Sequence, residues 1–320
     1  MTFDLIVIGS GPGGYVAAIR ASQLGMKVAV VEKAELGGIC LNWGCIPTKS
    51  LLKSAQVFDY IKHAADYGIV VNGDVEADFA KVIERSRTVA DGMSKGIQFL
   101  LKKNKIEVIT GFGKALRAGL VEVSTAEGET KELLCKNIII ATGARSRELS
   151  NLKQDGKKII GYRQALTLAE KPASMVVVGS GAIGTELASF YNSMGTEVTL
   201  VEFMPQLVPN EDEEVSKALG RSLKKAGIKV MTKSSVESVD TSGLLCKVSV
   251  KTKKGEEIIE AEKVLSAVGI TPNTENLGLE KAGINTEKGY ILVDEFYQTN
   301  IPGIYAIGDV IPGIALAHVA

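Results

Sequence analysis

The sequence has few histidines and cysteines and no excess of either charge. Only two histidines and four cysteines occur among 320 residues, and no histidine or second cysteine pair lies near Cys40 and Cys45. A metal site at those two cysteines is therefore disfavoured. The 37 acidic and 37 basic residues cancel, and this balance gives no support to nucleic-acid binding. We expect no metal and no nucleic acid among the ligands.

The sequence also has no long hydrophobic run and no leader pattern. No apolar stretch approaches the roughly twenty residues that cross a bilayer. The first eight residues have the pattern of a strand, without a basic segment or cleavage site ahead of it. We expect no membrane association, and a location in the cytoplasm or, in a eukaryote, the mitochondrial matrix. With 45% hydrophobic and 23% charged residues, the chain should form about two domains.

A glycine-rich turn follows the first predicted strand and begins the first predicted helix. Gly9, Gly11 and Gly14 form a Gly-x-Gly-x-x-Gly pattern there. Such glycines permit a tight turn, close approach of a pyrophosphate and close packing of helix on strand, while the helix N-terminus favours phosphate charge. Glu32 ends the second predicted strand, 23 residues after Gly9, where it can accept hydrogen bonds from ribose hydroxyls. This unit predicts dinucleotide binding.

The same pattern recurs in the second half of the chain. Gly179, Gly181 and Gly184 follow a predicted strand and begin a helix, and Glu202 again lies 23 residues after the first glycine. The duplication predicts two dinucleotide-binding units. An acid at position 202 favours NAD, because it would repel the 2′-phosphate of NADP.

Two cysteines lie between these repeats, in residues 36–49. Cys40 and Cys45 are five positions apart in a glycine-bearing loop that leads into a helix, and Pro47 suits the first helical turn. Cys45 is therefore expected near a helix N-terminus, where partial positive charge favours a thiolate. Lys49 follows one turn later, so its ammonium can lie on the same side. The pattern favours a redox pair, with a structural disulfide and a metal site as alternatives.

The remaining cysteines and one histidine have ordinary explanations. Cys135 and Cys246 have no thiol nearby in sequence and are interpreted as small buried hydrophobic residues. His63 has no partner at ligand spacing and is interpreted as a surface or packing residue.

The stretch between the two repeats predicts additional strands. Short strands at residues 107–109, 120–123 and 131–134 indicate an antiparallel meander, followed by a buried strand at 137–141. A strand at 304–309 would end in Asp309 at the ligand edge of a sheet. We expect an α/β fold of two Rossmann-like domains, each with a parallel sheet and a small antiparallel meander. The predicted boundaries are 1–145 with 276–320 for the first domain, and 146–275 for the second.

The motifs together resemble those of the pyridine nucleotide-disulfide oxidoreductases, most closely the dihydrolipoamide dehydrogenases, over nearly the whole chain. The matching segments are residues 9–14, 36–49, 141–143, 179–186, 267–273 and 305–310. The resemblance implies FAD and NAD as cofactors. It implies electron transfer from dihydrolipoamide through a Cys40–Cys45 disulfide and FAD to NAD. It further implies the lipoyl domain of a 2-oxo acid dehydrogenase complex as partner.

The resemblance also implies roles for single residues. Cys40 would exchange with the substrate disulfide, Cys45 would lie against the flavin, and Lys49 and Glu186 would pair near the reactive flavin nitrogen. The implied FAD-binding residues are Gly9, Gly11, Pro12, Gly13, Gly14, Glu32, Lys33, Gly38, Cys40, Lys49, Gly113, Ala141, Thr142, Gly143, Asp309, Leu316, Ala317 and His318. The implied NAD-binding residues are Gly179, Gly181, Ala182, Ile183, Gly184, Glu186, Glu202, Val236 and Gly269.

The sequence departs from the family pattern at its end. Family members continue beyond the point equivalent to Ala320 into an interface domain that forms the dimer and supplies a His–Glu acid–base pair. We therefore expect a shortened form, monomeric or weakly dimeric, that binds dinucleotides but turns over little dihydrolipoamide. The alternatives are a glutathione or mercuric reductase and a flavin-binding module without catalysis. Glu202 argues against a preference for NADPH. A further cysteine pair near the N-terminus, which would indicate mercury handling, is not found in the sequence.

Overall fold

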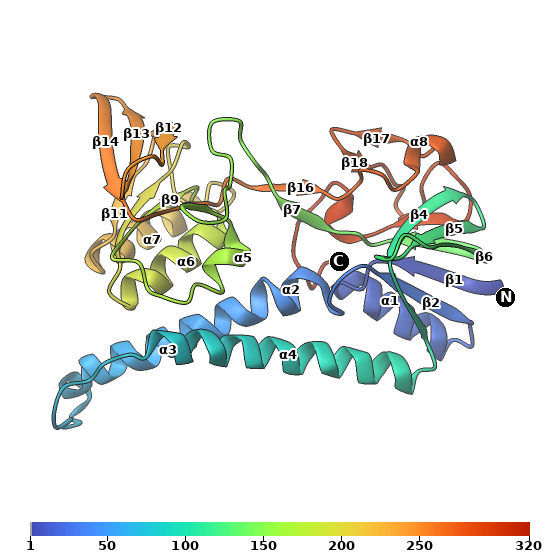
Figure 1. Ribbon diagram of the computed structural model, residues 1–320, viewed down its shortest axis with the longest axis horizontal. Coiled ribbons are helices and arrows are strands. Elements are labelled where there is room, and N and C mark those ends of the chain that lie inside the picture. The colour runs from blue at the N-terminus through green and yellow to red at the C-terminus, as the bar shows by residue number, and fades with distance from the viewer. Residues whose placement is uncertain (1) are drawn as a thin grey trace. The chain divides into compact units, whose positions relative to one another are not determined.

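The computed structural model describes residues 2–320, which divide into two compact units, each described separately below (Figure 1). Unit 1 contains residues 2–42, 90–145 and 270–320, and unit 2 contains residues 43–89 and 146–269. Residues 43–89, grouped with the first domain by the predicted boundaries, cluster with unit 2. Within that unit helix α3 packs on helix α6, a tertiary contact that sequence order does not reveal.

Unit 1 is built on a seven-stranded sheet in the order β3-β2-β1-β6-β5-β4, with β19 beside β6. Its strands are β1 (Thr2–Ile8), β2 (Val28–Glu32), β3 (Glu107–Thr110), β4 (Phe112–Arg117), β5 (Leu120–Ser124), β6 (Thr130–Ile140) and β19 (Ile304–Ala306). Its helices are α1 (Pro12–Gln23), α2 (Gly38–Asn42) and α8 (Leu279–Ala282), with a 3-10 turn at Gly308–Val310. Helix α1 packs against β1 and β2, and the first βαβ unit is confirmed (Figure 1).

The predicted meander of unit 1 is partly wrong. Strand β3 runs parallel to β2 in the main sheet, and the antiparallel strands are β4, β5 and β6. The strands predicted at 131–134 and 137–141 are one strand, β6, whose first half pairs with β5 and whose second half pairs with β1. Lys136, between the two predicted strands, lies within β6, and its ammonium forms an ion pair with Asp4. Periodicity alone could not show these pairings.

Unit 2 contains a parallel sheet in the order β11-β10-β9-β15-β8. Its strands are β8 (Ile159–Ile160), β9 (Ser174–Val178), β10 (Glu197–Val201), β11 (Lys229–Met231) and β15 (Lys263–Ser266). The small antiparallel meander predicted for the second domain is confirmed, with three strands in the order β12 (Ser235–Asp240), β13 (Cys246–Thr252) and β14 (Gly255–Ala261).

Among the described residues, four α-helices lie wholly in unit 2, and two of them, α3 and α6, carry predicted site residues. The helices are α3 (Cys45–Lys62), α5 (Tyr162–Ala165), α6 (Ala182–Ser193) and α7 (Glu213–Lys225), with a 3-10 turn at Ala64–Tyr67. Helix α4 (Phe79–Lys103) begins among the residues of unit 2 and ends among those of unit 1. Two short two-stranded sheets complete the fold: β7 (Ala144–Ser146) with β16 (Ile270–Pro272), and β17 (Thr286–Glu287) with β18 (Tyr290–Ile291).

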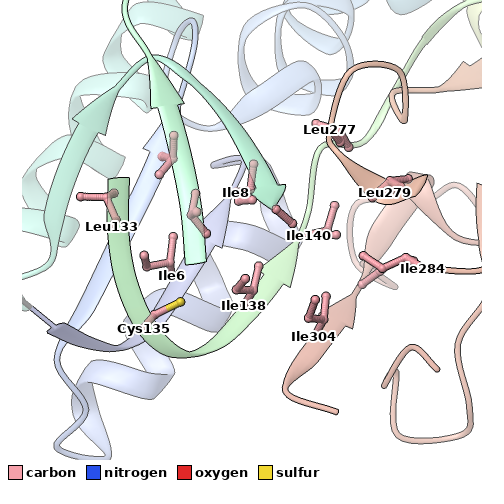
Figure 2. Close-up of a cluster of buried hydrophobic side chains, with 14 of the residues drawn as sticks. Ile6, Ile8, Leu133, Cys135, Ile138, Ile140, Leu277, Leu279, Ile284 and Ile304 are labelled. Carbon is pink, nitrogen blue, oxygen red and sulfur yellow. The ribbon is translucent and has the colours of Figure 1, made fainter. Parts of the chain in front are cut away.

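Each unit has its own apolar core, and each core contains one free cysteine. Figure 2 shows Cys135 among the isoleucines and leucines of the unit 1 sheet, where only 8% of it is exposed. Cys246 is fully buried in the core of unit 2. Both predictions are confirmed, and burial raises the pKa of the Cys135 thiol to about 11, which makes it a poor nucleophile.

Two other sequence expectations concern the surface. His63 is exposed after the end of α3, where its Nδ1 lies 2.9 Å from the Asp59 carbonyl, in agreement with a surface residue. Within residues 2–320, no helix has both the length and the apolar character needed to cross a membrane.

Candidate dinucleotide turns and redox loop

The first glycine-rich turn has two glycines required by packing and one that faces open space. Gly9 has a φ of +101°, and a side chain there would overlap the carbonyl of Ala141 at the end of β6. A side chain at Gly14 would overlap the carbonyl of Gly9. A Cβ at Gly11 would meet no atom within 4 Å. The turn therefore leaves space above the start of α1, where unpaired N–H groups favour an anion, and this cradle fits a dinucleotide pyrophosphate.

The second turn repeats this geometry in unit 2. Gly179 has a φ of +98°, and its side chain would overlap the carbonyl of Ala267 at the end of β15. A side chain at Gly184 would overlap the carbonyl of Gly179, and a Cβ at Gly181 would again meet nothing within 4 Å. Helix α6 begins at Ala182, so the same anion cradle is present.

Two buried serines orient the two acids. Ser10 donates from its N–H and Oγ to Glu32 Oε2, at 2.9 and 2.6 Å, and Ser180 donates in the same way to Glu202 Oε2, at 2.8 and 2.7 Å. In each unit the backbone N–H two residues after the acid donates to Oε1. A carboxylate oxygen accepts more than one hydrogen bond, so both acids retain capacity for a ribose hydroxyl. The serines had a sequence signal that we did not use: both repeats read Gly-Ser-Gly.

The last segment of unit 1 returns to the start of α1. A Cβ on Gly13 would lie 3.1 Å from Ile307 Cδ1 and 3.0 Å from the carbonyl carbon of Ala320. Residues 317–319 form a turn, closed by the Val319 N–H donating to the Leu316 carbonyl at 2.9 Å. The predicted FAD-binding residues Leu316, Ala317 and His318 therefore lie at a single turn, in a segment that ends beside the first glycine-rich turn.

Asp309 lies just beyond the sheet rather than at its strand end. Strand β19 stops at Ala306, and Asp309 is in the 3-10 turn that follows, half-buried. Burial raises the pKa of its carboxyl above the ordinary value, and no hydrogen bond or ion pair to this carboxylate occurs within residues 2–320. An acid in this position has acceptor capacity for a hydroxyl-rich ligand, and the resemblance implies that it contacts FAD.

The end of β6 is fastened to a later segment of unit 1. Thr142 Oγ1 donates to the Asn273 carbonyl at 2.8 Å, and Asn273 Nδ2 donates to the Thr142 carbonyl at 2.9 Å. The Arg145 guanidinium forms two hydrogen bonds to Glu275, at 2.6 and 2.8 Å, and holds the pKa of that carboxyl below its usual range. These bonds fix the backbone of residues 141–143. A Cβ on Gly143 would meet no atom within 4 Å, so the backbone there is open to a ligand.

Cys40 and Cys45 form a disulfide. Cys40 lies in α2 and is half-buried, whereas Cys45 is the first residue of α3 and is exposed. The predicted position of Cys45 at a helix N-terminus is confirmed, and Pro47 lies in the first turn of that helix. A sulfur placed there as a thiolate is stabilised by the helix dipole.

The predicted ion pair between Lys49 and Glu186 is present. Lys49 Nζ lies 2.5 Å from Glu186 Oε1, and both residues belong to unit 2, on α3 and α6. The side chains are 62% and 30% exposed. The pair gives the helix that begins at Cys45 a charged contact to the helix that begins at the second glycine-rich turn.

Of three other predicted cofactor-binding residues, two face the core and one is exposed. A Cβ on Gly113 would face the core, 3.0 Å from Ile8 Cγ2, and Val236 is buried in the core of unit 2. The Val236 carbonyl accepts a hydrogen bond from Asn151 Nδ2 at 2.8 Å. Lys33 is exposed, with its ammonium 5.6 Å from the centre of the Phe112 ring.

The remaining predicted positions have open surroundings. A Cβ on Gly269 would meet nothing within 4 Å, and Ile183, at the start of α6, is 39% exposed. Gly38 has a φ of +63°, and a Cβ there would lie 2.6 Å from the Cα of Gly11, so the cysteine loop begins directly against the first turn.

Comparisons with known proteins agree with this geometry. The family model described as pyridine nucleotide-disulphide oxidoreductase matches residues 3–320. A dihydrolipoyl dehydrogenase of Rhizobium etli is 46% identical over 334 residues, covering 100% of this chain and 69% of that protein. One of Zymomonas mobilis is 48% identical over 320 residues, covering 99% and 68%. The crystal structure of LpdA from Mycobacterium tuberculosis superposes with a TM-score of 0.89 at 30% identity, over 99% of this chain and 70% of that one.

Proposed function

Because the chain belongs to the pyridine nucleotide-disulphide oxidoreductase family, we propose that it is a disulfide oxidoreductase of the dihydrolipoyl dehydrogenase type. The observation that carries this proposal is the Cys40–Cys45 disulfide at a helix N-terminus, in a chain with two matching dinucleotide turns. FAD would be held on unit 1 and would supply the two-electron chemistry of the reaction, and NAD would be held on unit 2. The redox role is favoured over a structural disulfide because the relatives are redox enzymes.

The two cysteines exchange with a dithiol substrate. One substrate thiolate attacks Cys40 Sγ, the Cys40–Cys45 bond breaks, and Cys45 leaves as a thiolate. The second substrate thiol, on losing its proton, displaces Cys40, so that the substrate becomes a disulfide and the loop holds one thiol and one thiolate. The start of α3 stabilises the Cys45 thiolate, which makes it the better leaving group.

The dinucleotide contacts divide between the units. The cradle at Gly11 and the acids Glu32 and Asp309 support FAD in unit 1, and Ala320 lies beside Gly13 of the same glycine-rich turn. The cradle at Gly181 and the buried Glu202 support NAD in unit 2, because a 2′-phosphate would meet the carboxylate. Lys49 is the cation that the resemblance assigns to the flavin, held in place by Glu186.

The names of the relatives support a proposal for the substrate. We assign dihydrolipoamide, presented by the lipoyl domain of a 2-oxo acid dehydrogenase complex, as the dithiol. The resemblance implies a homodimer for the family, and the proposed location is the cytoplasm, or the mitochondrial matrix in a eukaryote.

A spectrum of the purified chain tests the proposal. Bound flavin absorbance is expected, with a long-wavelength band that forms on two-electron reduction and disappears in the Cys45→Ser variant. NADH should bleach the flavin more readily than NADPH. A preference for NADPH would favour a glutathione or mercuric reductase instead. Flavin that NADH does not bleach would indicate a binding module without catalysis.

A further inference from the structure

The cysteine loop contains the only tryptophan of the chain, and two arginines lie over its ring. Trp43 lies between Cys40 and Cys45 in sequence and is half-buried. The guanidinium carbon of Arg87, on α4, is 4.3 Å from the ring centre, and that of Arg163, on α5, is 4.8 Å away. All three residues belong to unit 2. We refer to Arg87, Trp43 and Arg163 as the tryptophan clamp.

The clamp joins three elements that are distant in sequence. Trp43 precedes α3, Arg87 comes from the middle of α4, and Arg163 comes from the short helix α5, where it also lies over the Tyr162 ring at 6.0 Å. A guanidinium over an indole face is held by the ring quadrupole and by stacking, and arginine forms this contact better than lysine does. Arg163 is exposed and Arg87 is half-buried, so neither is required to fill the core.

The two guanidiniums place positive charge beside the loop, and this charge attracts negative charge that develops in the loop. Reduction of the neighbouring disulfide produces such charge, because one sulfur of the loop becomes a thiolate. Reduction also removes the covalent bond that joins Cys40 to Cys45. The contacts of the clamp do not require the Cys40–Cys45 bond, because the two arginines contact the ring of Trp43, which lies between the cysteines.

We propose that Arg87 and Arg163, acting through Trp43, are positioning residues that keep the cysteine loop in place once the disulfide is open. In the oxidised chain the disulfide holds the loop, and the clamp is redundant. In the reduced chain the clamp holds the loop, and its positive charge favours the thiolate. This inference rests on the proposed function only in taking the disulfide to open and close during turnover.

The fluorescence of Trp43 gives a direct test, because it is the only tryptophan. The disulfide is opened with a water-soluble phosphine, which becomes a phosphine oxide as water supplies the oxygen and the two thiol protons. Mass spectrometry after alkylation confirms the opening. Acrylamide quenching is then measured on both forms of the wild type, Arg163→Gln, Arg163→Lys and the double variant Arg87→Gln with Arg163→Gln.

The expected result is a difference confined to the reduced state. All oxidised forms should be quenched equally. After reduction the wild type should be quenched about as before, the double variant at least about twofold more, and Arg163→Gln by an intermediate amount. Arg163→Lys should behave like Arg163→Gln, because lysine keeps the charge but loses the stack.

A matched control separates the clamp from net charge. Arg221→Gln removes one positive charge from an exposed position on α7 of the same unit, without contact to Trp43, and should leave quenching unchanged in both states. The rate of thiol alkylation against pH should also shift to higher pH in the double variant and not in Arg221→Gln. This shift reports loss of thiolate stabilisation, which a purely structural contact would not produce.

Equal quenching of the reduced wild type and the reduced double variant would overturn the proposal. Arg163 is exposed, so the single variant keeps the test valid even if the double variant fails to fold. Failure of the proposed function would give a different result, namely a chain without flavin absorbance or without reduction by NADH. Because the phosphine opens the disulfide chemically, the clamp is tested in either case.

Discussion

The two units hold the acid at the end of the second strand in the same way, but they differ in the residue that donates to the serine from the loop beyond it. In both, a buried serine of the glycine-rich turn holds the acid at the end of the second strand. In both, the same serine receives a backbone N–H from the loop beyond that acid, from Gly37 in unit 1 and Val208 in unit 2, each at 3.1 Å to the serine carbonyl and 3.3 Å to Oγ. The donor is a glycine at φ +98° in one unit and a valine at φ +40° in the other.

The difference shows which part of a duplicated module stays constant. The turn and the acid, which we propose bind a nucleotide in each unit, have the same geometry in both. The following loop is used differently: in unit 1 it leads into α2 and the cysteines, and in unit 2 it leads towards α7. A β-branched residue with positive φ is strained, and its strain is maintained by the surrounding hydrogen bonds.

The largest expected effect is a loss of stability when the first glycine of either turn is replaced. Gly9→Ala and Gly179→Ala should each lower the free energy of unfolding by at least about 3 kcal/mol, because the added carbon overlaps a carbonyl at a positive φ. Denaturant unfolding of both variants measures it. Gly25→Ala is the control, since its φ is also positive (+86°) but nothing lies within 4 Å, and it should cost only about 1–2 kcal/mol. Equal costs for Gly9→Ala and Gly25→Ala would contradict the packing account.

The second prediction separates the two units by ligand. Gly11→Ala should fold normally but retain little FAD, and Gly181→Ala should keep FAD while its Kd for NAD rises at least about tenfold, or about 1.4 kcal/mol. In both, the new carbon projects into the open cradle rather than into protein. Flavin absorbance per chain and NAD titration measure the effects, and each variant is the control for the other. Loss of both ligands in one variant would show that the cradles are not independent.

The third prediction ranks the two serines. Ser10→Ala and Ser180→Ala each leave a carboxylate without its side-chain donor, which should cost about 1–3 kcal/mol of stability. Ser180→Ala should cost more, because Glu202 is only 6% exposed whereas Glu32 is partly open to water. Thermal unfolding of the two variants compares them. A larger loss for Ser10→Ala would mean that burial of the acid does not set the cost.

A smaller effect is expected where the units differ. Val208→Gly should raise the free energy of unfolding by up to about 1 kcal/mol, because glycine adopts this φ without strain while its added chain entropy offsets part of the gain. The reciprocal Gly37→Val should destabilise, since a Cβ there would lie 2.7 Å from Leu41 Cδ2. Calorimetry measures the stability of both variants. A destabilised Val208→Gly would show that the contacts of the valine side chain stabilise the fold by more than the backbone strain destabilises it.

The smallest predicted effect is a pH dependence specific to unit 1. The pKa of Asp309 is raised in the folded chain by burial, so the folded state binds this proton more tightly than the unfolded state does. The protonated carboxyl therefore contributes stability at low pH, and this contribution is lost as pH rises through the folded pKa. Compared with Asp309→Asn, the ligand-free wild type should become relatively less stable from about pH 4 upward. Parallel stability curves for the two proteins would contradict this sign.

The sequence was most informative where local chemistry sets the structure. Gly9 to Glu32 and Gly179 to Glu202 were predictable, because glycine spacing and a terminal acid determine a βαβ turn with little help from the rest of the chain. The Lys49–Glu186 pair depended on the family resemblance, since 137 residues separate the partners. Strand β3 and the continuity of β6 could not be predicted, because pairing direction depends on neighbours that periodicity does not identify. The clamp on Trp43 was missed for the same reason: its arginines come from two other helices.

The shared serine hydroxyl has a consequence for how this protein could be altered. It acts as a fixed anchor point for whatever loop follows the acid, at residue 37 in one unit and residue 208 in the other. A transplanted loop would therefore need only to present one N–H at that anchor, with its remaining length and chemistry free to vary. An engineer could use unit 2 in this way as a second attachment point for a thiol pair, leaving the nucleotide turn beneath it untouched.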